Sequence, residues 1–164
     1  QSPIMSAAIY LKKYKGVDGK FAYIGPCIAK KKEAEYTEDV DYVITFEEIG
    51  SIFAGLDIKI EEMVPYHIDE RAYLHSHGYG HTGGVAGAVE QHLGRNVDYI
   101  AVSNLNRKNI ALLKAYAKTG KCPVKFIEVM ACEGGCVTGP VIYNDKNFSQ
   151  TNYIKVLEEL AKEY

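Results

Sequence analysis

Val124-Lys-Phe-Ile-Glu-Val-Met-Ala131 runs directly into Cys132-Glu-Gly-Gly-Cys136. The first eight residues are rich in β-branched and aromatic side chains, which predicts a strand. The two glycines make a short and flexible spacer between the cysteines. A strand that ends at a pair of thiols determines both the fold class and the chemistry that we expect for this chain.

Strand and helix patterns alternate along the rest of the sequence. We expect strands at residues 21–24, 42–44, 99–102 and 124–131, and helices at 3–15, 27–34, 46–54, 82–93 and 105–118 and around 153–161. Helices of this length between short strands predict an α/β fold with mainly parallel sheets flanked by helices. Sites in such folds lie beyond the carboxyl ends of the strands.

Local signals fix several helix starts and faces. Ser2-Pro3 can cap the first helix, and Thr45 with Glu48 forms the pattern of a capping box. Apolar residues at helical spacing are expected to be buried. These are Ile49, Ile52 and Phe53, then Val85, Val89 and Leu93, then Leu105, Leu112, Leu113 and Tyr116, and finally Tyr153, Ile154, Leu157, Leu160 and Ala161.

The composition excludes several classes of protein. The net charge is −2, with 47% hydrophobic and 24% charged residues, which argues against a nucleic-acid partner. No apolar run approaches the roughly 20 residues that cross a bilayer, so we expect no membrane partner. Residues 1–13 lack the pattern of a secretory signal. Four cysteines in a chain without such a signal favour reduced thiols in the cytoplasm.

A second cysteine occupies an equivalent place in the pattern. Cys27 follows the expected strand 21–24 after Gly25-Pro26, much as Cys132 follows another strand. We therefore expect both thiols at the same rim of the sheet. A helix start and the nearby lysines at 30–32 would lower the pKa of the Cys27 thiol. Thiolates hold iron–sulfur clusters, so a redox protein is the leading hypothesis.

Other interpretations of these residues stay open. A cysteine after a strand is often a small core residue, and Cys-x3-Cys also suits zinc or a dithiol. The strand between Cys122 and Cys132 spans about 30 Å, which places Cys122 at the opposite end of the sheet, so we expect it to be structural. His75, His77 and His81 could bind zinc or nickel, or could simply belong to a polar, Gly-rich loop.

Three segments resemble a known family. Gly25-Pro-Cys-Ile-Ala-Lys-Lys-Lys-Glu33 resembles the second cysteine motif of iron-only (FeFe) hydrogenases, and Glu128-Val-Met-Ala-Cys-Glu-Gly-Gly-Cys136 resembles the third. His81-Thr-Gly-Gly-Val85 is similar to a segment that lies between them. The resemblance covers roughly residues 1–145. It implies that 1–164 is a fragment of the two-lobed H-cluster domain, and that it lacks the first cysteine motif.

The resemblance also implies a cofactor and its ligands. In this family a 4Fe–4S cubane is linked through a cysteine sulfur to a di-iron unit that carries carbonyl, cyanide and a dithiolate. By resemblance, Cys27 and Cys132 ligate the cubane, and Cys136 ligates it and bridges to the di-iron unit. The family's reaction interconverts protons and electrons with H2. An electron carrier such as ferredoxin, or fused iron–sulfur domains, is the implied partner.

Three further site residues are implied in the same way. Lys30 would hold a cyanide ligand through a charge-assisted hydrogen bond. Glu33 would lie on the proton route to solvent. Met130 would pack against the di-iron unit.

Two departures from the catalytic pattern favour a sensory branch of the family. Gly25 stands where catalytic members commonly have Met. After the last cysteine, catalytic members commonly have a Gly-rich run and Gln-Pro, whereas this chain has Val137-Thr-Gly-Pro-Val-Ile142. In the sensory branch the cluster domain is joined to signalling modules. The hypotheses are thus an oxidoreductase, a hydrogen or redox sensor without turnover, and an inert or zinc-binding fragment.

Overall fold

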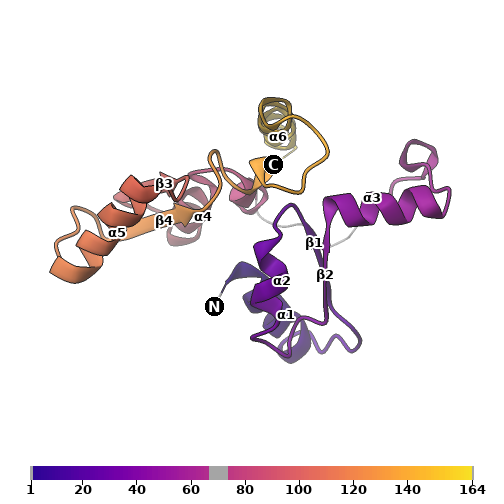
Figure 1. Ribbon diagram of the computed structural model, residues 1–164, viewed down its shortest axis with the longest axis horizontal. Coiled ribbons are helices and arrows are strands. Elements are labelled where there is room, and N and C mark those ends of the chain that lie inside the picture. The colour runs from indigo at the N-terminus through magenta and orange to yellow at the C-terminus, as the bar shows by residue number, and fades with distance from the viewer. Residues whose placement is uncertain (1, 67–73, 164) are drawn as a thin grey trace. The chain divides into compact units, whose positions relative to one another are not determined.

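The computed structural model describes residues 2–66 and 74–163. The chain divides into two compact units. The first unit is Gln1–Pro65 together with Pro140–Tyr143, and the second is Tyr66–Gly139 together with Asn144–Tyr164. Each unit contains one two-stranded parallel sheet (Figure 1).

The first unit is built around a β–α–β crossover. Its elements are α1 (Pro3–Lys13), β1 (Ala22–Gly25), α2 (Ala29–Ala34), β2 (Tyr42–Thr45), α3 (Phe46–Gly55) and the short 3-10 helix η1 (Ile60–Glu62). The strands β1 and β2 pair in parallel, with Ala22 opposite Tyr42 and Gly25 opposite Thr45. α2 links the two strands, and the thiol of Cys27 lies on the connection that leads into it.

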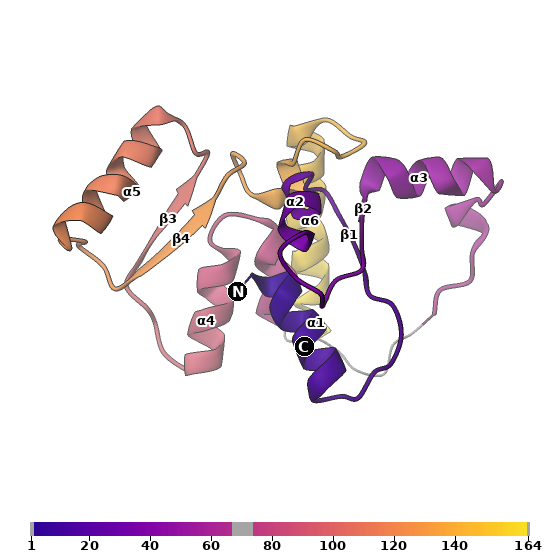
Figure 2. The same cartoon turned by 60° about the horizontal axis from the view of Figure 1, so that its bottom comes forward.

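The second unit repeats this arrangement with more helix. Its elements are η2 (Leu74–Gly80, a 3-10 helix), α4 (Gly84–Leu93), β3 (Tyr99–Ser103), α5 (Arg107–Thr119), β4 (Phe126–Met130), η3 (Cys136–Thr138) and α6 (Lys146–Leu160). β3 and β4 pair in parallel, from Tyr99 opposite Phe126 to Ser103 opposite Met130. In both views α4 and α5 lie on opposite sides of this pair (Figures 1 and 2).

The predicted α/β class and the parallel pairing are confirmed. The prediction that Cys27 and Cys132 lie at the rim of one sheet is wrong, because β1 and β4 belong to different sheets. β4 is also shorter than the apolar run 124–131. It extends only as far as its partner β3 offers residues to pair with.

Burial differs from the predicted helix faces. α4 buries Gly84, Ala86 and Ala88 instead of its larger aliphatic residues, and Leu93 is exposed. At Gly84 the reason is the close backbone approach of α4 to η2, which leaves no room for a side chain. α3, α5 and α6 bury no residue completely. In the first unit, Ile24 of β1 is 47% exposed.

The helix ends follow local chemistry. Gly94 and Gly120 end α4 and α5 with positive φ angles of 62° and 65°. Asn106 caps α5, since its side chain accepts a hydrogen bond from the backbone N–H of Asn109. Ser2 occupies the N-cap position of α1 and Pro3 its first turn, as predicted, but the Ser2 side chain makes no capping hydrogen bond. Within 2–66 and 74–163, no helix has the length and apolar character to cross a bilayer.

The capping box at the start of α3 is confirmed and gives a pH-dependent prediction. The Thr45 hydroxyl accepts from the Glu48 backbone N–H at 3.2 Å, and the Glu48 carboxylate accepts from the Thr45 backbone N–H at 2.8 Å. Lys31 donates to the same carboxylate at 2.7 Å, and this bond, with the Thr45 contacts, lowers the pKa of Glu48 from 4.5 to about 2. The pKa of Glu48 is lower in the folded chain than in the unfolded chain. Glu48 therefore stabilises the first unit above about pH 4.5, and this stabilisation is lost as the pH falls toward 2.

We therefore expect Glu48→Gln to lower the urea midpoint of unfolding at neutral pH but to have little effect near pH 2. Glu47→Gln is the matched control, because Glu47 lies in the same first turn outside the box. Far-UV circular dichroism across this pH range measures the difference. A Glu48→Gln effect of equal size at both ends of the range would contradict the assignment.

Candidate functional site

Two free thiols follow β4. Cys132 lies two residues beyond the strand and is half-buried, whereas Cys136 begins η3 and is exposed. They are joined by Glu133-Gly-Gly135, in which Gly134 and Gly135 have φ angles of +81° and +109°. These angles favour glycine, so the spacer sequence determines how the second thiol is presented.

Hydrogen bonds within the loop fix its shape. The backbone N–H of Gly135 donates to the carbonyl of Cys132 at 3.2 Å. The buried hydroxyl of Thr138 donates to the carbonyl of Gly135 at 2.9 Å and also contacts the carbonyl of Glu133. The two thiols are therefore held at the ends of an ordered turn.

The loop rests on the backbone of residues 80–82. The N–H of Thr82 donates to the carbonyl of Gly134 at 3.1 Å. A Cβ on Gly135 would lie 2.6 Å from the carbonyl oxygen of Gly80 and 2.7 Å from the Cα of His81. Only glycine permits this approach, so the Gly-Gly pair serves packing as well as loop conformation.

A buried carboxylate connects β4 to the start of α4. Glu128 is 4% exposed, and its two oxygens accept hydrogen bonds from the backbone N–H groups of Gly83 at 2.6 Å and Ala86 at 2.9 Å. The strand that leads to Cys132 thus also holds the Thr82-Gly-Gly segment. Sequence reasoning missed this role. The available signal was a charged residue in the middle of an otherwise apolar strand.

The chemistry of this region fits an iron–sulfur group. Two thiols lie on one loop, and two glycines with positive φ angles separate them. Among the described residues, the buried hydroxyl of Thr82 finds no hydrogen-bond partner, which leaves a polar atom available beside the loop. Cys122 is half-buried and precedes β4, so it and Cys132 lie at opposite ends of the strand, as predicted.

The predicted site residues of the first unit contact one another. Cys27 is half-buried and lies two residues ahead of α2, and its carbonyl accepts from the backbone N–H of Lys30 at 3.3 Å. The ammonium of Lys30 pairs with the carboxylate of Glu33. Partial burial is the largest single effect and raises the pKa of Glu33, but the hydrogen bonds from Lys30 and Ser2 and the charge of Lys30 together outweigh it, so the net shift is downward. Glu33 is therefore a stabilised anion.

Met130 is the last residue of β4 and is 8% exposed, so it belongs to the core of the second unit. The three histidines do not form a metal site. His81 Nδ1 lies 2.8 Å from the carbonyl oxygen of Thr82. In residues 2–66 and 74–163, no three His, Cys, Asp or Glu side chains are grouped so that they could hold a metal ion.

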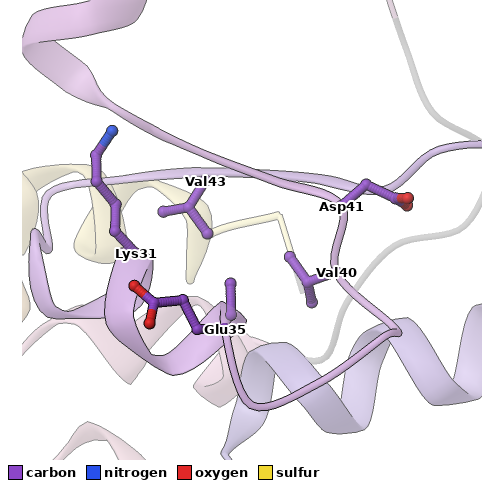
Figure 3. A pocket seen from close by; sticks show the side chains of 6 residues that line it. Lys31, Glu35, Val40, Asp41 and Val43 are labelled. Atoms are coloured by element: carbon purple, nitrogen blue, oxygen red, sulfur yellow. The ribbon is translucent and has the colours of Figure 1, made fainter.

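A cavity of about 290 Å³ lies in the first unit between α2 and β2 (Figure 3). Its lining residues are Lys31, Ala34, Glu35, Val40, Asp41 and Val43, and none of the cysteines is among them. Its charged residues are all paired, since Lys31 pairs with Glu48 and Asp41 with Lys20, each at 2.7 Å, and Glu35 pairs with Lys32. The cavity therefore carries no sign of a ligand.

Residues 1–140 match the sequence model of the iron only hydrogenase large subunit, C-terminal domain. The chain belongs to this family. Among curated relatives, the cytosolic iron-sulfur assembly component 3 of Rattus norvegicus is 29% identical over 158 residues, covering 70% of this chain and 33% of the relative. Iron hydrogenase 1 of Clostridium pasteurianum is 27% identical over 172 residues, covering 79% and 30%.

Solved FeFe-hydrogenases share the fold. A variant of HydA1 from Chlamydomonas reinhardtii superposes with a TM-score of 0.61 at 19% identity, covering 95% of this chain and 58% of that one. A HydA structure on stepwise H-cluster assembly gives a TM-score of 0.60 at 20% identity, covering 94% and 57%. The hydrogenase-like chain thus spans about a third of its curated relatives and under three-fifths of the solved chains.

Proposed function

We propose that this chain is the cluster-binding part of a hydrogenase-type iron–sulfur protein, which in its intact form interconverts protons and electrons with H2. The ordered loop that presents Cys132 and Cys136 carries the proposal. Together with Cys27, these cysteines would hold a 4Fe–4S cubane, and the more exposed Cys136 would bridge to a di-iron unit. That cofactor would supply the hydrogen chemistry.

The chain's own residues would bind and orient this group. Lys30 would donate a charge-assisted hydrogen bond to a cyanide ligand. Its ion pair with Glu33 orients the ammonium, and Glu33 would pass protons between the site and solvent. Met130, buried at the end of β4, would pack against the di-iron unit.

A sensor that binds the cluster without turnover is the second candidate, and Gly25 favours it. A Cβ on Gly25 would lie 2.6 Å from Cζ of Tyr23. The Tyr23 ring thus fills the space next to the position where catalytic members commonly carry Met. The segment 137–142 departs from the catalytic pattern as well. Signalling modules would then be the partners, in place of ferredoxin or fused iron–sulfur domains.

Both candidates are iron–sulfur proteins, and the relatives named as cytosolic iron-sulfur assembly components support that shared feature and a cytoplasmic location. The test is iron and acid-labile sulfide per chain after anaerobic reconstitution of this chain and of the intact protein. Uptake of about four irons in a cubane supports the proposal, and H2-dependent dye reduction then separates enzyme from sensor. Zinc uptake, or no metal at all, would overturn both candidates.

Cysteine substitutions test the ligand assignment. Cys132→Ser or Cys136→Ser is expected to reduce the bound iron from about four to below one per chain, because a cubane needs its thiolates. Cys122→Ser is the matched control and should leave the iron content unchanged, since Cys122 lies at the other end of β4. Loss of iron in Cys122→Ser would show that the ligands are assigned wrongly.

A further inference from the structure

The last helix, α6, lies beyond residues 1–140 that match the family, yet it contacts the region around the cysteine loop. The hydroxyl of Tyr153 accepts a hydrogen bond from the N–H of Gly80 at 3.0 Å and donates one to the carbonyl of His77. The Tyr153 ring also meets the His81 ring edge-on, with centroids 6.1 Å apart. One side chain therefore holds both ends of the turn 77–80.

That turn needs an external support. η2 is a seven-residue 3-10 helix, a conformation with poorer hydrogen-bond geometry than an α-helix and seldom longer than a few residues. A phenol hydroxyl can donate and accept at once, so Tyr153 satisfies one backbone carbonyl and one backbone N–H together. Phenylalanine would keep the ring contact but lose both bonds.

The supported backbone is the surface on which the cysteine loop rests. Gly135 packs against Gly80 and His81, where even a Cβ would not fit. The Thr82 N–H bonds the carbonyl of Gly134 across the same contact. The loop's second thiol, Cys136, follows directly in the chain.

We propose that Tyr153 is a positioning residue for Cys136, acting through residues 80–82 and the glycine pair. The proposal rests on the proposed function only in treating Cys136 as a cluster ligand. The rival interpretation is that Tyr153 merely anchors α6. The two differ at Thr82, whose N–H bonds the cysteine loop and not Tyr153.

Amide hydrogen exchange on the metal-free chain separates these possibilities. In Tyr153→Phe we expect exchange about five- to tenfold faster at both Gly80 and Thr82, as for the loss of an ordinary hydrogen bond. Tyr143→Phe is the matched control, because it removes a phenol bond to the Glu47 carbonyl in the first unit. Faster exchange at Gly80 alone, or equal effects in both variants, would overturn the proposal.

A second measurement needs no substitution. In the unsubstituted chain, Gly80 and Thr82 should exchange through one opening, with the same dependence of the exchange rate on urea. If the Gly80 and Thr82 amides exchange through separate openings, with different urea dependences, the proposal that Tyr153 acts on the cysteine loop through residues 80–82 is overturned.

The reconstituted protein gives a third readout, namely the electron paramagnetic resonance spectrum and midpoint potential of the reduced cluster. Both should change in Tyr153→Phe and not in Tyr143→Phe. If the cluster binds and Tyr153→Phe leaves both unchanged, positioning is refuted while the proposed function stands. If the unsubstituted protein binds no iron, the proposed function fails, and the exchange experiments still decide whether Tyr153 holds the loop.

Discussion

Gly84→Ala is expected to destabilise the second unit by about 3 kcal/mol, at the upper end for overpacking a buried position. Gly84 and Gly78 are both buried. A Cβ on Gly84 would lie 2.5 Å from the carbonyl carbon of Gly78 and would overlap its oxygen. Backbone atoms cannot rotate away as a side chain can, so α4 would have to separate from η2.

Gly87→Ala is the control within the same helix. A Cβ at that position meets only the Nδ1 atom of His75, at 3.3 Å, and this side chain can move. Because alanine favours a helix interior over glycine, Gly87→Ala should be neutral or stabilising by about 0.5 kcal/mol. Urea unfolding of both variants, followed by far-UV circular dichroism, makes the comparison. A Gly84→Ala variant as stable as Gly87→Ala would contradict the close backbone contact.

The contact between Gly84 and Gly78 shows what the sequence alone could not predict. Thr82-Gly-Gly was expected to open a helix, and α4 does begin at Gly84. The capping box of Thr45 and Glu48 was also predictable, because its partners lie three residues apart. In such local patterns the interacting residues lie close together in the sequence, so the pattern itself predicts the interaction. The contact of Gly84 with Gly78 depends instead on how two elements approach, which a helix pattern does not encode.

Burial was predicted less well for the same reason. Val85, Val89 and Leu93 have the spacing of a buried face, but α4 buries Gly84, Ala86 and Ala88 instead, and Gly84 lies against the backbone of η2. Cys132 after β4 was predictable from a segment rich in β-branched and aromatic residues. The prediction of a common rim with Cys27 failed because strand order is set by which strands pair, not by the strand sequences themselves.

Glu128→Ala is expected to cost about 3 kcal/mol of stability in the second unit, because two backbone N–H groups lose a charged acceptor. The N–H groups belong to Gly83 and Ala86, far from Glu128 in the sequence. The sequence alone presents Glu128 as a polar residue between Ile127 and Val129, so this bond could not be predicted. We also expect weaker iron retention, since the bond fixes the Thr82 segment on which the cysteine loop rests.

Glu90→Ala is the matched control for this prediction. The Glu90 carboxylate accepts a single backbone bond, from the Val97 N–H at 2.8 Å, so its loss should cost about 1 kcal/mol. Equal costs for the two variants would refute the special role of Glu128. A double variant adds a sharper comparison with Gly84→Ala. Glu128 and Gly84 both fix the start of α4. The double variant should therefore lose less stability than the sum of the losses in the two single variants. Strict additivity would mean that the start of α4 is held by two energetically independent contacts.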